Sequence, residues 1–189
     1  MANKQPEVTA QTRRNLQQAF WSLYSERPIT KISIKEITDR AGYNRGTFYL
    51  YYRDVYDILD QMEQEILDTI DALIQKRLIK DGILDIQGNM GFIIGLAKSH
   101  ERGRVIARLL GDDGDPHFKA RFKELIWPLV EVYLNPAGTF SPTEERFVKE
   151  FYLSGLLSVI TAWLEDDTGM SIEELIQLIM HKILRAEAR

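Results

Sequence analysis

The chain has 189 residues, of which 44% are hydrophobic and 28% charged, which excludes a disordered or fibrous protein and allows one domain or a small domain joined to a larger one. It contains no cysteine, which excludes disulfides, thiolate metal sites and cysteine nucleophiles. The net charge of −4 argues, taken alone, against a nucleic-acid partner.

Membrane and export segments are not apparent in the sequence. No apolar run approaches the roughly 20 residues that a membrane-spanning helix needs. The N-terminal stretch lacks the apolar centre of a signal peptide. We therefore expect a cytoplasmic protein that does not interact with a membrane.

Charge is distributed unevenly along the chain. Residues 9–53 hold eight basic and three acidic side chains and carry a net charge of +5, whereas residues 54–189 carry −9. A basic segment attached to an acidic remainder is typical of a polyanion-binding module joined to something else. Chance clustering on a solvated surface remains the alternative explanation.

The N-terminal segment predicts three helices in succession. Ser33 and Glu36 form a capping box that begins the second helix, and Gly42 can end it in the left-handed conformation. Asn44 can cap a third helix over residues 45–52. The first helix is indicated by an apolar stripe at helical spacing, formed by Leu16, Ala19, Phe20, Leu23 and Tyr24.

Two short helices joined by a glycine-containing turn describe a helix-turn-helix. Phe48 and Tyr52, four residues apart, are expected to pack inward. The same pattern also fits an ordinary tight helical hairpin without DNA binding. Four polar or aromatic side chains are expected at or near the exposed side of the second helix: Arg45, Thr47, Tyr49 and Tyr51.

Helical spacing continues after Asp54. A long helix is expected from Val55 to about Lys80, without a flexible linker before it. Further helices are expected near 86–99, 103–110, 116–134, 143–166 and 171–187, and Pro128 predicts a kink in the third of these. The sequence therefore predicts an all-α protein with a helix-turn-helix domain over residues 1–54 and a larger helical domain over residues 55–189.

The segment at residues 41–52, AGYNRGTFYLYY, is the most distinctive part of the chain, and it follows Thr12-Arg13 and the segment 29–37. Residues 12–59 as a whole resemble the DNA-binding domain of the TetR family of bacterial transcriptional regulators. The resemblance implies an all-helical homodimer with three DNA-binding N-terminal helices and a larger domain that binds an effector. Most such proteins repress transcription and release DNA when a small molecule binds.

The resemblance implies DNA-binding roles for ten residues. Arg45 and Gly46 match positions that face the major groove, where arginine can donate two hydrogen bonds to guanine. Lys35 matches a position that reaches a base or a phosphate, and Thr47 can contact a thymine methyl or a phosphate. Asn44 can read a base or act only as a helix cap. The other candidates are phosphate contacts: Thr30, Ser33, Tyr49, Tyr51 and Arg53.

One position departs from the family pattern. Many members carry a lysine that pairs with phosphate where this chain has Val55. Arg53 is one possible replacement, and packing of Val55 beneath the recognition helix is another interpretation.

The resemblance also implies a homodimer through residues 143–187. A twofold dimer would place two recognition helices on a near-palindromic operator in double-stranded DNA, with half-sites about one helical turn apart. The same side chains also fit a role within the core of a single chain. The small ones are Ser154, Gly155, Ser158 and Ala162, and the apolar ones are Ile172, Leu175, Ile176, Ile179 and Ile183.

An unknown small-molecule effector is expected between helices of the domain over residues 55–189, where aromatic side chains can form its walls. Aromatic residues at helical spacing are equally typical of a core, so the sequence assigns no effector-binding residue. The candidates are Phe92, Phe122, Trp127, Tyr133, Phe151, Tyr152 and Trp163.

Catalysis and cofactors lack a supporting pattern. The three histidines, His100, His117 and His181, have no metal-binding spacing, and the acidic stretch 112–115 fits a turn better than a calcium loop. We expect no catalytic residue, no metal and no cofactor. The leading hypothesis is a ligand-responsive repressor, and the alternative is a TetR-like interaction adaptor or co-regulator without operator binding.

Overall fold

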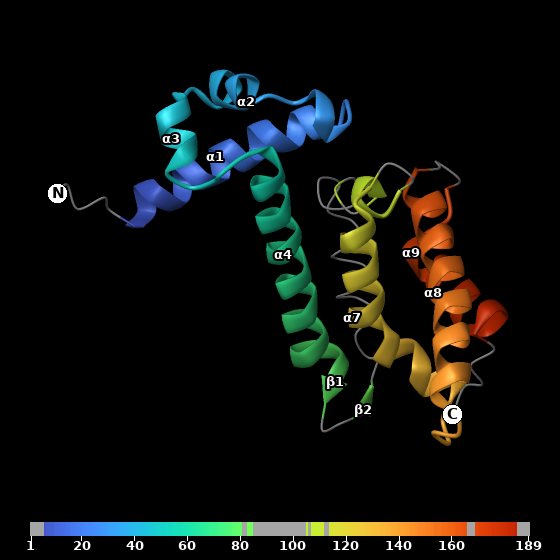
Figure 1. The fold of residues 1–189 in the computed structure, drawn as a ribbon. Coiled ribbons are helices and arrows are strands. Elements are labelled where there is room, and N and C mark those ends of the chain that lie inside the picture. The colour runs from blue at the N-terminus through green and yellow to red at the C-terminus, as the bar shows by residue number, and fades with distance from the viewer. Residues whose placement is uncertain are drawn as a thin grey trace. The chain divides into compact units, whose positions relative to one another are not determined.

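The computed structural model describes residues 6–80, 83–84, 105, 107–111, 114–165 and 169–184. The chain divides into two compact units, the N-terminal unit Met1–Asp68 and the C-terminal unit Thr69–Arg189. Helices make up almost all the regular structure of the described residues, as Figure 1 shows, and the predicted all-helical fold class is confirmed. The helix predicted near 86–99 lies outside the described residues.

The N-terminal unit is built from α1 (Pro6–Tyr24), a 3₁₀ turn (Ile29–Lys31), α2 (Ile34–Ala41), α3 (Arg45–Tyr49) and the first part of α4 (Val55–Leu73). Phe48 and Tyr52 are buried with their ring centroids 5.4 Å apart, which confirms that they pack inward. Each helix contributes at least one fully buried side chain to the core, namely Leu16, Phe20, Ile37, Phe48 and Ile58.

Local signals in the sequence determine where α2 and α3 begin and end. Ser33 Oγ accepts a hydrogen bond from the backbone N–H of Glu36, and the Glu36 carboxylate accepts one from the N–H of Ser33. Gly42 ends α2 with φ 74° and ψ 30°, in the left-handed region that glycine adopts without a Cβ penalty. The predicted capping box, helix end and helix-turn-helix are confirmed.

The long helix after Asp54 is shorter than predicted. α4 ends at Leu73, and a π-helical turn (Ile74–Leu78) leads into β1 (Ile79–Lys80). β1 pairs antiparallel with β2 (Ile83–Leu84), with Ile79 opposite Leu84. The prediction of helix to Lys80 is wrong. Apolar residues at helical spacing do not reveal a strand of two residues, although the β-branched Ile79 and Ile83 favour one.

In the C-terminal unit the described helices are α7 (Pro116–Leu134), α8 (Pro142–Glu165) and α9 (Ile172–Leu178), which is followed by a π-helical turn (Ile179–Ile183). Residues 105 and 107–110 are also helical, within the range predicted at 103–110. The helices share an apolar core built on Trp127, Val130, Leu153, Leu156 and Leu184.

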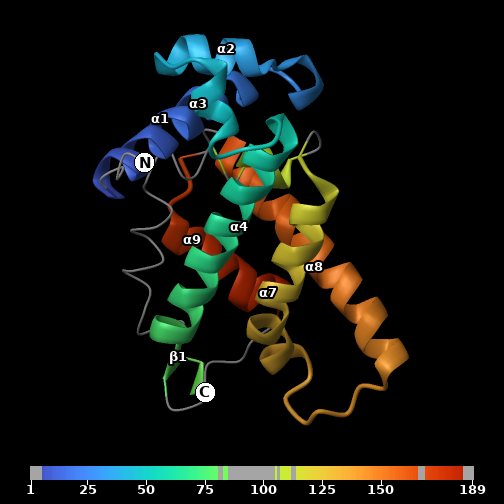
Figure 2. The ribbon, with the colours of Figure 1, turned by 60° about the vertical axis from the view of Figure 1, so that its left-hand side comes forward.

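α7 contains Pro128 in its interior and spans the predicted range 116–134. Figures 1 and 2 both show the axis of α7 changing direction toward its C-terminal end. Proline removes one backbone donor and clashes with the preceding turn, which accounts for such a bend.

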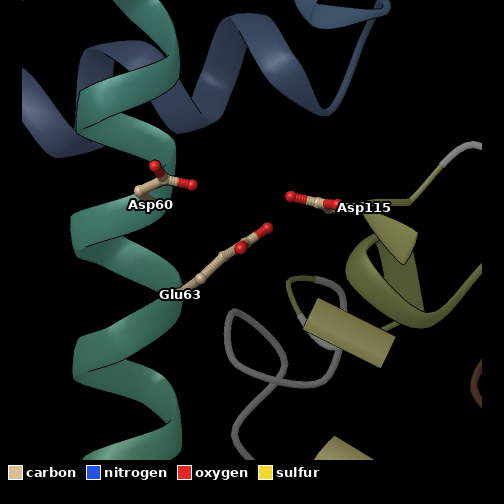
Figure 3. A group of neighbouring side chains, drawn as sticks. All are labelled: Asp60, Glu63 and Asp115. Carbon is tan, nitrogen blue, oxygen red and sulfur yellow. The ribbon is translucent and has the colours of Figure 1, made fainter. Parts of the chain in front are cut away.

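The N-terminal unit has a buried acidic side chain, whereas the C-terminal unit has one that caps a helix. On α4, Asp60 and Glu63 project from the same side of the helix, as Figure 3 shows, and Glu63 is 1% exposed. Asp115 precedes α7, and its carboxylate accepts a hydrogen bond from the backbone N–H of His117 at 2.8 Å. Asp115 therefore caps the N-terminus of α7.

α8 is long and apolar enough to cross a membrane by length and composition, with a mean hydropathy of 1.3 over 18 residues. The expectation that no segment reaches this length and apolarity is therefore wrong. Only 17% of that window is buried within the chain. A single helix of this kind is weak evidence for a membrane, and the same apolar surface also suits contact with another protein surface.

Candidate nucleic-acid interface

The N-terminus of α3 is held by Asn44. Its side-chain oxygen accepts a hydrogen bond from the backbone N–H of Thr47 at 2.8 Å, and the Thr47 hydroxyl lies 3.3 Å from the same oxygen. A Cβ on Gly46 would come within 3.2 Å of that oxygen, so glycine leaves room for the cap. The prediction of Asn44 as a helix cap is confirmed, and this contact fixes the direction in which α3 starts.

Exposed side chains follow directly after this cap. Arg45 is exposed at the first position of α3, and Tyr49 is 58% exposed at its last. Leu50, which sequence reasoning did not select, is 64% exposed. Leu50 lies two residues from both Phe48 and Tyr52, which are buried, so helical spacing places it on another side of the helix. This spacing could have identified Leu50 as exposed. α3 and the residue that caps its end thus present a cation, a phenol and an apolar side chain to solvent.

Two candidates near α3 are less exposed. Thr47 is half-buried and its hydroxyl contacts the Asn44 cap. Tyr51 is half-buried, its ring centroid lies 6.4 Å from that of Tyr52, and its carbonyl accepts a hydrogen bond from Gln61. These contacts give both residues a structural role within the N-terminal unit.

Polar candidates near the start of α2 include groups that already have intramolecular partners. Ser33 uses its hydroxyl in the capping box, donating to Glu36 at 2.7 Å. Lys35 is exposed and forms an ion pair with Asp39 at 2.7 Å, four residues along the helix. Thr30 is exposed in the 3₁₀ turn.

Arg53 lies between α3 and α4 with its side chain 84% exposed. Its guanidinium is 3.1 Å from the Asp57 carboxylate, and its backbone N–H donates to the same carboxylate at 2.8 Å. These contacts, the backbone one first, lower the pKa of Asp57, and the carboxylate in turn raises the pKa of Arg53. Val55, the departure from the family pattern, is half-buried at the start of α4.

The eight cations of residues 9–53 divide into two groups. Five form ion pairs within the unit: Arg13 with Glu65, Arg27 with Glu36, Lys35 with Asp39, Arg40 with Glu26, and Arg53 with Asp57. Among the residues that the structure describes, the other three are exposed and form no ion pair: Arg14, Lys31 and Arg45. The charge count pointed to Lys31 and Arg14, but the family pattern did not select them.

α8 carries an exposed stripe of apolar and small side chains within the range predicted for the dimer. Phe147 is 62% and Phe151 74% exposed, and Gly155, Ser158 and Ala162 continue the same face at helical spacing. An added Cβ at Gly155 would meet nothing within 4 Å. These five residues are called the α8 stripe.

Other predicted dimer residues lie away from the α8 stripe. Ser154 is half-buried and contacts Lys123 and Glu150 through its hydroxyl. Leu175 on α9 is buried, whereas Ile172, Ile176, Ile179 and Ile183 are half-buried. Part of the predicted set therefore belongs to the core of the chain itself, as the sequence allowed.

The aromatic candidates for an effector site do not share one environment. Phe122 and Trp127 are buried, Phe151 is exposed in the α8 stripe, and Phe92 lies outside the described residues. Trp163 donates its indole N–H to the carbonyl of Met170 at 2.8 Å. The described residues therefore add no assignment to an effector site.

The N-terminal and C-terminal parts of the chain each match a family of transcriptional regulators. Residues 18–62 match the family described as bacterial regulatory proteins, tetR family, and residues 96–184 match the transcriptional regulator C-terminal region. A curated relative, the uncharacterized HTH-type transcriptional regulator YxbF of Bacillus subtilis (strain 168), is 22% identical over 165 residues, or 87% of this chain. The chain spans 42% of the length of that relative.

Two solved structures share the fold. A TetR transcriptional regulator from Streptococcus agalactiae 2603V has a TM-score of 0.64 and 24% identity, and the match covers 90% of this chain and 92% of that one. The fatty acid degradation regulator FadR from Bacillus halodurans has a TM-score of 0.58 and 19% identity, over 100% of this chain and 99% of that one. The sequence matches and the helix-turn-helix agree, and the chain belongs to the TetR family of helix-turn-helix transcriptional regulators, which are not enzymes.

Proposed function

We propose that this regulator binds a near-palindromic operator as a homodimer, represses transcription from it, and leaves it when a small-molecule effector binds. In this proposal residues 1–54 form the DNA-binding domain, and residues 55–189 form the effector-binding and dimerisation domain. The protein acts in the cytoplasm, where it reaches the operator. The observation that carries the proposal is the exposed Arg45 at the capped N-terminus of α3.

Base recognition falls to the start of α3. Arg45 has a guanidinium with no ion pair among the described residues, so it does not have to break an internal contact to reach guanine O6 and N7. Gly46 allows the backbone to approach DNA closely because it has no side chain. Thr47 contacts a thymine methyl or a phosphate, and Asn44 contributes by orienting α3.

Phosphate contacts hold the helix in register. Tyr49 and Tyr51 donate phenolic hydrogen bonds, and Thr30 and Ser33 donate hydroxyl hydrogen bonds from the segment before α2. Lys35 and Arg53 each exchange an internal carboxylate for a phosphate oxygen. Both cations are exposed, so water screens each internal ion pair and little stability is lost when it is exchanged.

Dimerisation is supported by the α8 stripe. A helix whose most apolar window is only 17% buried within the chain leaves an apolar surface in water, which a second copy can cover. Gly155, Ser158 and Ala162 allow two such helices to approach closely, and Phe147 and Phe151 supply apolar contact area. The proposed interface comprises residues 143–187.

The test is a selection from randomised double-stranded DNA with the full chain. The proposal expects enrichment of a near-palindrome with half-sites about one helical turn apart, and an affinity that falls steeply with salt. Enrichment of asymmetric sites would overturn the dimeric arrangement. Absence of enrichment would overturn operator binding.

A second candidate function is an interaction adaptor or co-regulator of the same family. It is favoured by one observation, the five internal ion pairs that already engage most cations of residues 9–53. The selection separates the two candidates, because an adaptor enriches no DNA sequence.

A further inference from the structure

A polar cluster joins three elements of the N-terminal unit around Arg13 of α1. Arg13 Nη2 donates to Glu65 Oε1 of α4 at 2.9 Å and to Gln61 Oε1 at 3.2 Å. Gln17, one turn further along α1, donates to the other oxygen of Glu65 at 3.1 Å. Both carboxylate oxygens of Glu65 therefore receive hydrogen bonds from α1.

The same cluster reaches the residues that directly follow α3. Gln61 donates through Nε2 to the carbonyl oxygen of Tyr51 at 3.4 Å. Tyr52 is 2% exposed, and its hydroxyl has no hydrogen-bond partner among the described residues, although its proximity raises the pKa of Arg13. Burial raises the pKa of Tyr52, and Arg13 partly offsets this. Arg13 thus contacts α4 directly, and Gln61 connects this cluster to the segment that follows α3.

These contacts matter because α3 is short. It has five residues, too few to hold an orientation by its own backbone hydrogen bonds. Its start is fixed by the Asn44 cap, and its end continues through Tyr51 and Tyr52 into α4. α4 is also the helix that crosses from the N-terminal unit into the C-terminal unit at Asp68.

We propose that Arg13 and Glu65 are positioning residues for operator binding, which orient α3 by joining α1 to α4 without contacting DNA themselves. This inference rests on the proposed function. According to this inference, a change in α4 alters the orientation of Arg45 through the ion pair between α1 and α4. Loss of either partner leaves the cation at Arg45 in place but lets α3 adopt other orientations, which weakens operator binding.

Net charge alone predicts a different result, and this distinguishes the two explanations. Replacing Glu65 by glutamine removes a negative charge from a DNA-binding unit, which on electrostatic grounds strengthens DNA binding. Positioning predicts the reverse, because the ion pair with Arg13 is lost. Glu65→Gln is therefore the most informative variant. Because the Glu65 side chain is 53% exposed, we expect this variant to stay folded.

The experiment uses the full chain and, as probe, a labelled duplex enriched by the wild type from randomised DNA. Kd is measured at several salt concentrations for Arg13→Gln, Glu65→Gln and the charge-exchanged double variant Arg13→Glu/Glu65→Arg. The matched controls are Arg14→Gln and Glu26→Gln. Arg14 hydrogen bonds only within α1, to Gln11, in the described part of the chain, and Glu26 lies 3.8 Å from Arg40.

We expect Kd to rise roughly tenfold for Arg13→Gln and Glu65→Gln, as for other residues coupled in one network. The slope of log Kd against log salt should stay unchanged, whereas loss of a direct phosphate contact lowers it by about one. The double variant should recover most of the lost affinity. The controls should not show this combination of weaker binding and unchanged slope.

Thermal unfolding of each variant separates misfolding from misorientation. Equal affinities of Arg13→Gln and Arg14→Gln, tighter binding by Glu65→Gln, or a reduced salt slope for Arg13→Gln would each overturn the inference while the proposed function stands. If Arg13→Gln melts at the assay temperature, Glu65→Gln and the double variant decide the matter. A wild-type chain that enriches no DNA overturns the proposed function and this inference with it.

Discussion

Arg45 lies at the first position of α3 with its guanidinium in solvent and without an ion pair among the described residues. We predict that Arg45→Ala weakens binding to the selected operator by about 1–3 kcal/mol and reduces discrimination against a scrambled duplex. Gel-shift titration with both duplexes measures this loss, and sedimentation should show an unchanged dimer. Arg14→Ala is the control for simple loss of a cation. Unchanged affinity of Arg45→Ala would contradict the assigned role.

Glu36 belongs to the cap of α2 and also pairs with Arg27 at 2.6 Å. The Ser33 hydroxyl, followed by Arg27, lowers the pKa of Glu36 to about 2. Because the pKa in the folded state is depressed, the stabilisation is complete above the unfolded pKa of about 4.3 and is lost as the pH falls through about 2.

We therefore predict that Glu36→Gln lowers the melting temperature at neutral pH, and that the difference from the wild type shrinks between about pH 4.5 and pH 2. Thermal unfolding followed by circular dichroism across this range measures the difference. Glu26→Gln removes a carboxylate that lies 3.8 Å from Arg40 and serves as the control. A gap between wild type and Glu36→Gln that stays constant down to pH 2 would refute the prediction.

At the scale of elements, the turn between α2 and α3 depends on the backbone of Gly42. Its φ of 74° lies in the left-handed region, and an added Cβ would meet no atom within 4 Å. Gly42→Ala should therefore destabilise the chain by about 1 kcal/mol through backbone strain alone, and Gly42→Asn by less. Chemical denaturation tests both variants. Equal stability of Gly42→Ala and the wild type would show that the turn tolerates another conformation.

Elements whose causes are local could be predicted from the sequence. The Ser33–Glu36 capping box, the Gly42 helix end and the Asn44 cap each depend on residues a few positions apart, and all three occur. The end of α4 could not be predicted, because Ile79 fits the stripe of a helix as well as a two-residue strand.

Contacts within the candidate site follow the same distinction. The ion pairs Lys35–Asp39 and Arg53–Asp57 have the spacing of four residues that the sequence displays, although the family resemblance directed both cations to DNA. The pair between Arg13 and Glu65 joins positions 52 residues apart, and no regular spacing in the sequence predicts it. Such contacts depend on how α1 packs against α4, which only the folded unit defines.

For the whole molecule, the α8 stripe is the surface on which the dimer proposal can fail. We predict that Phe151→Asp, at a position 74% exposed within the chain, leaves the helix content unchanged but converts the dimer to a monomer. Sedimentation velocity and circular dichroism measure the two properties. Val132→Asp is the control, since Val132 is 47% exposed on α7 outside residues 143–187. A dimeric Phe151→Asp protein would remove the stripe from the interface.

One tryptophan lies in the N-terminal unit and two lie in the C-terminal unit, so intrinsic fluorescence can report on each unit. Trp21 is the tryptophan of Met1–Asp68 and lies edge-on to Tyr24, with ring centroids 5.6 Å apart. Trp127 donates its indole N–H to Glu145 at 3.0 Å and has the ammonium of Lys149 5.9 Å from its ring, so its emission should respond to rearrangement of α7 against α8. With Trp127 and Trp163 replaced by phenylalanine, the remaining tryptophan fluorescence would come from the N-terminal unit alone, so changes in the two units could be followed separately.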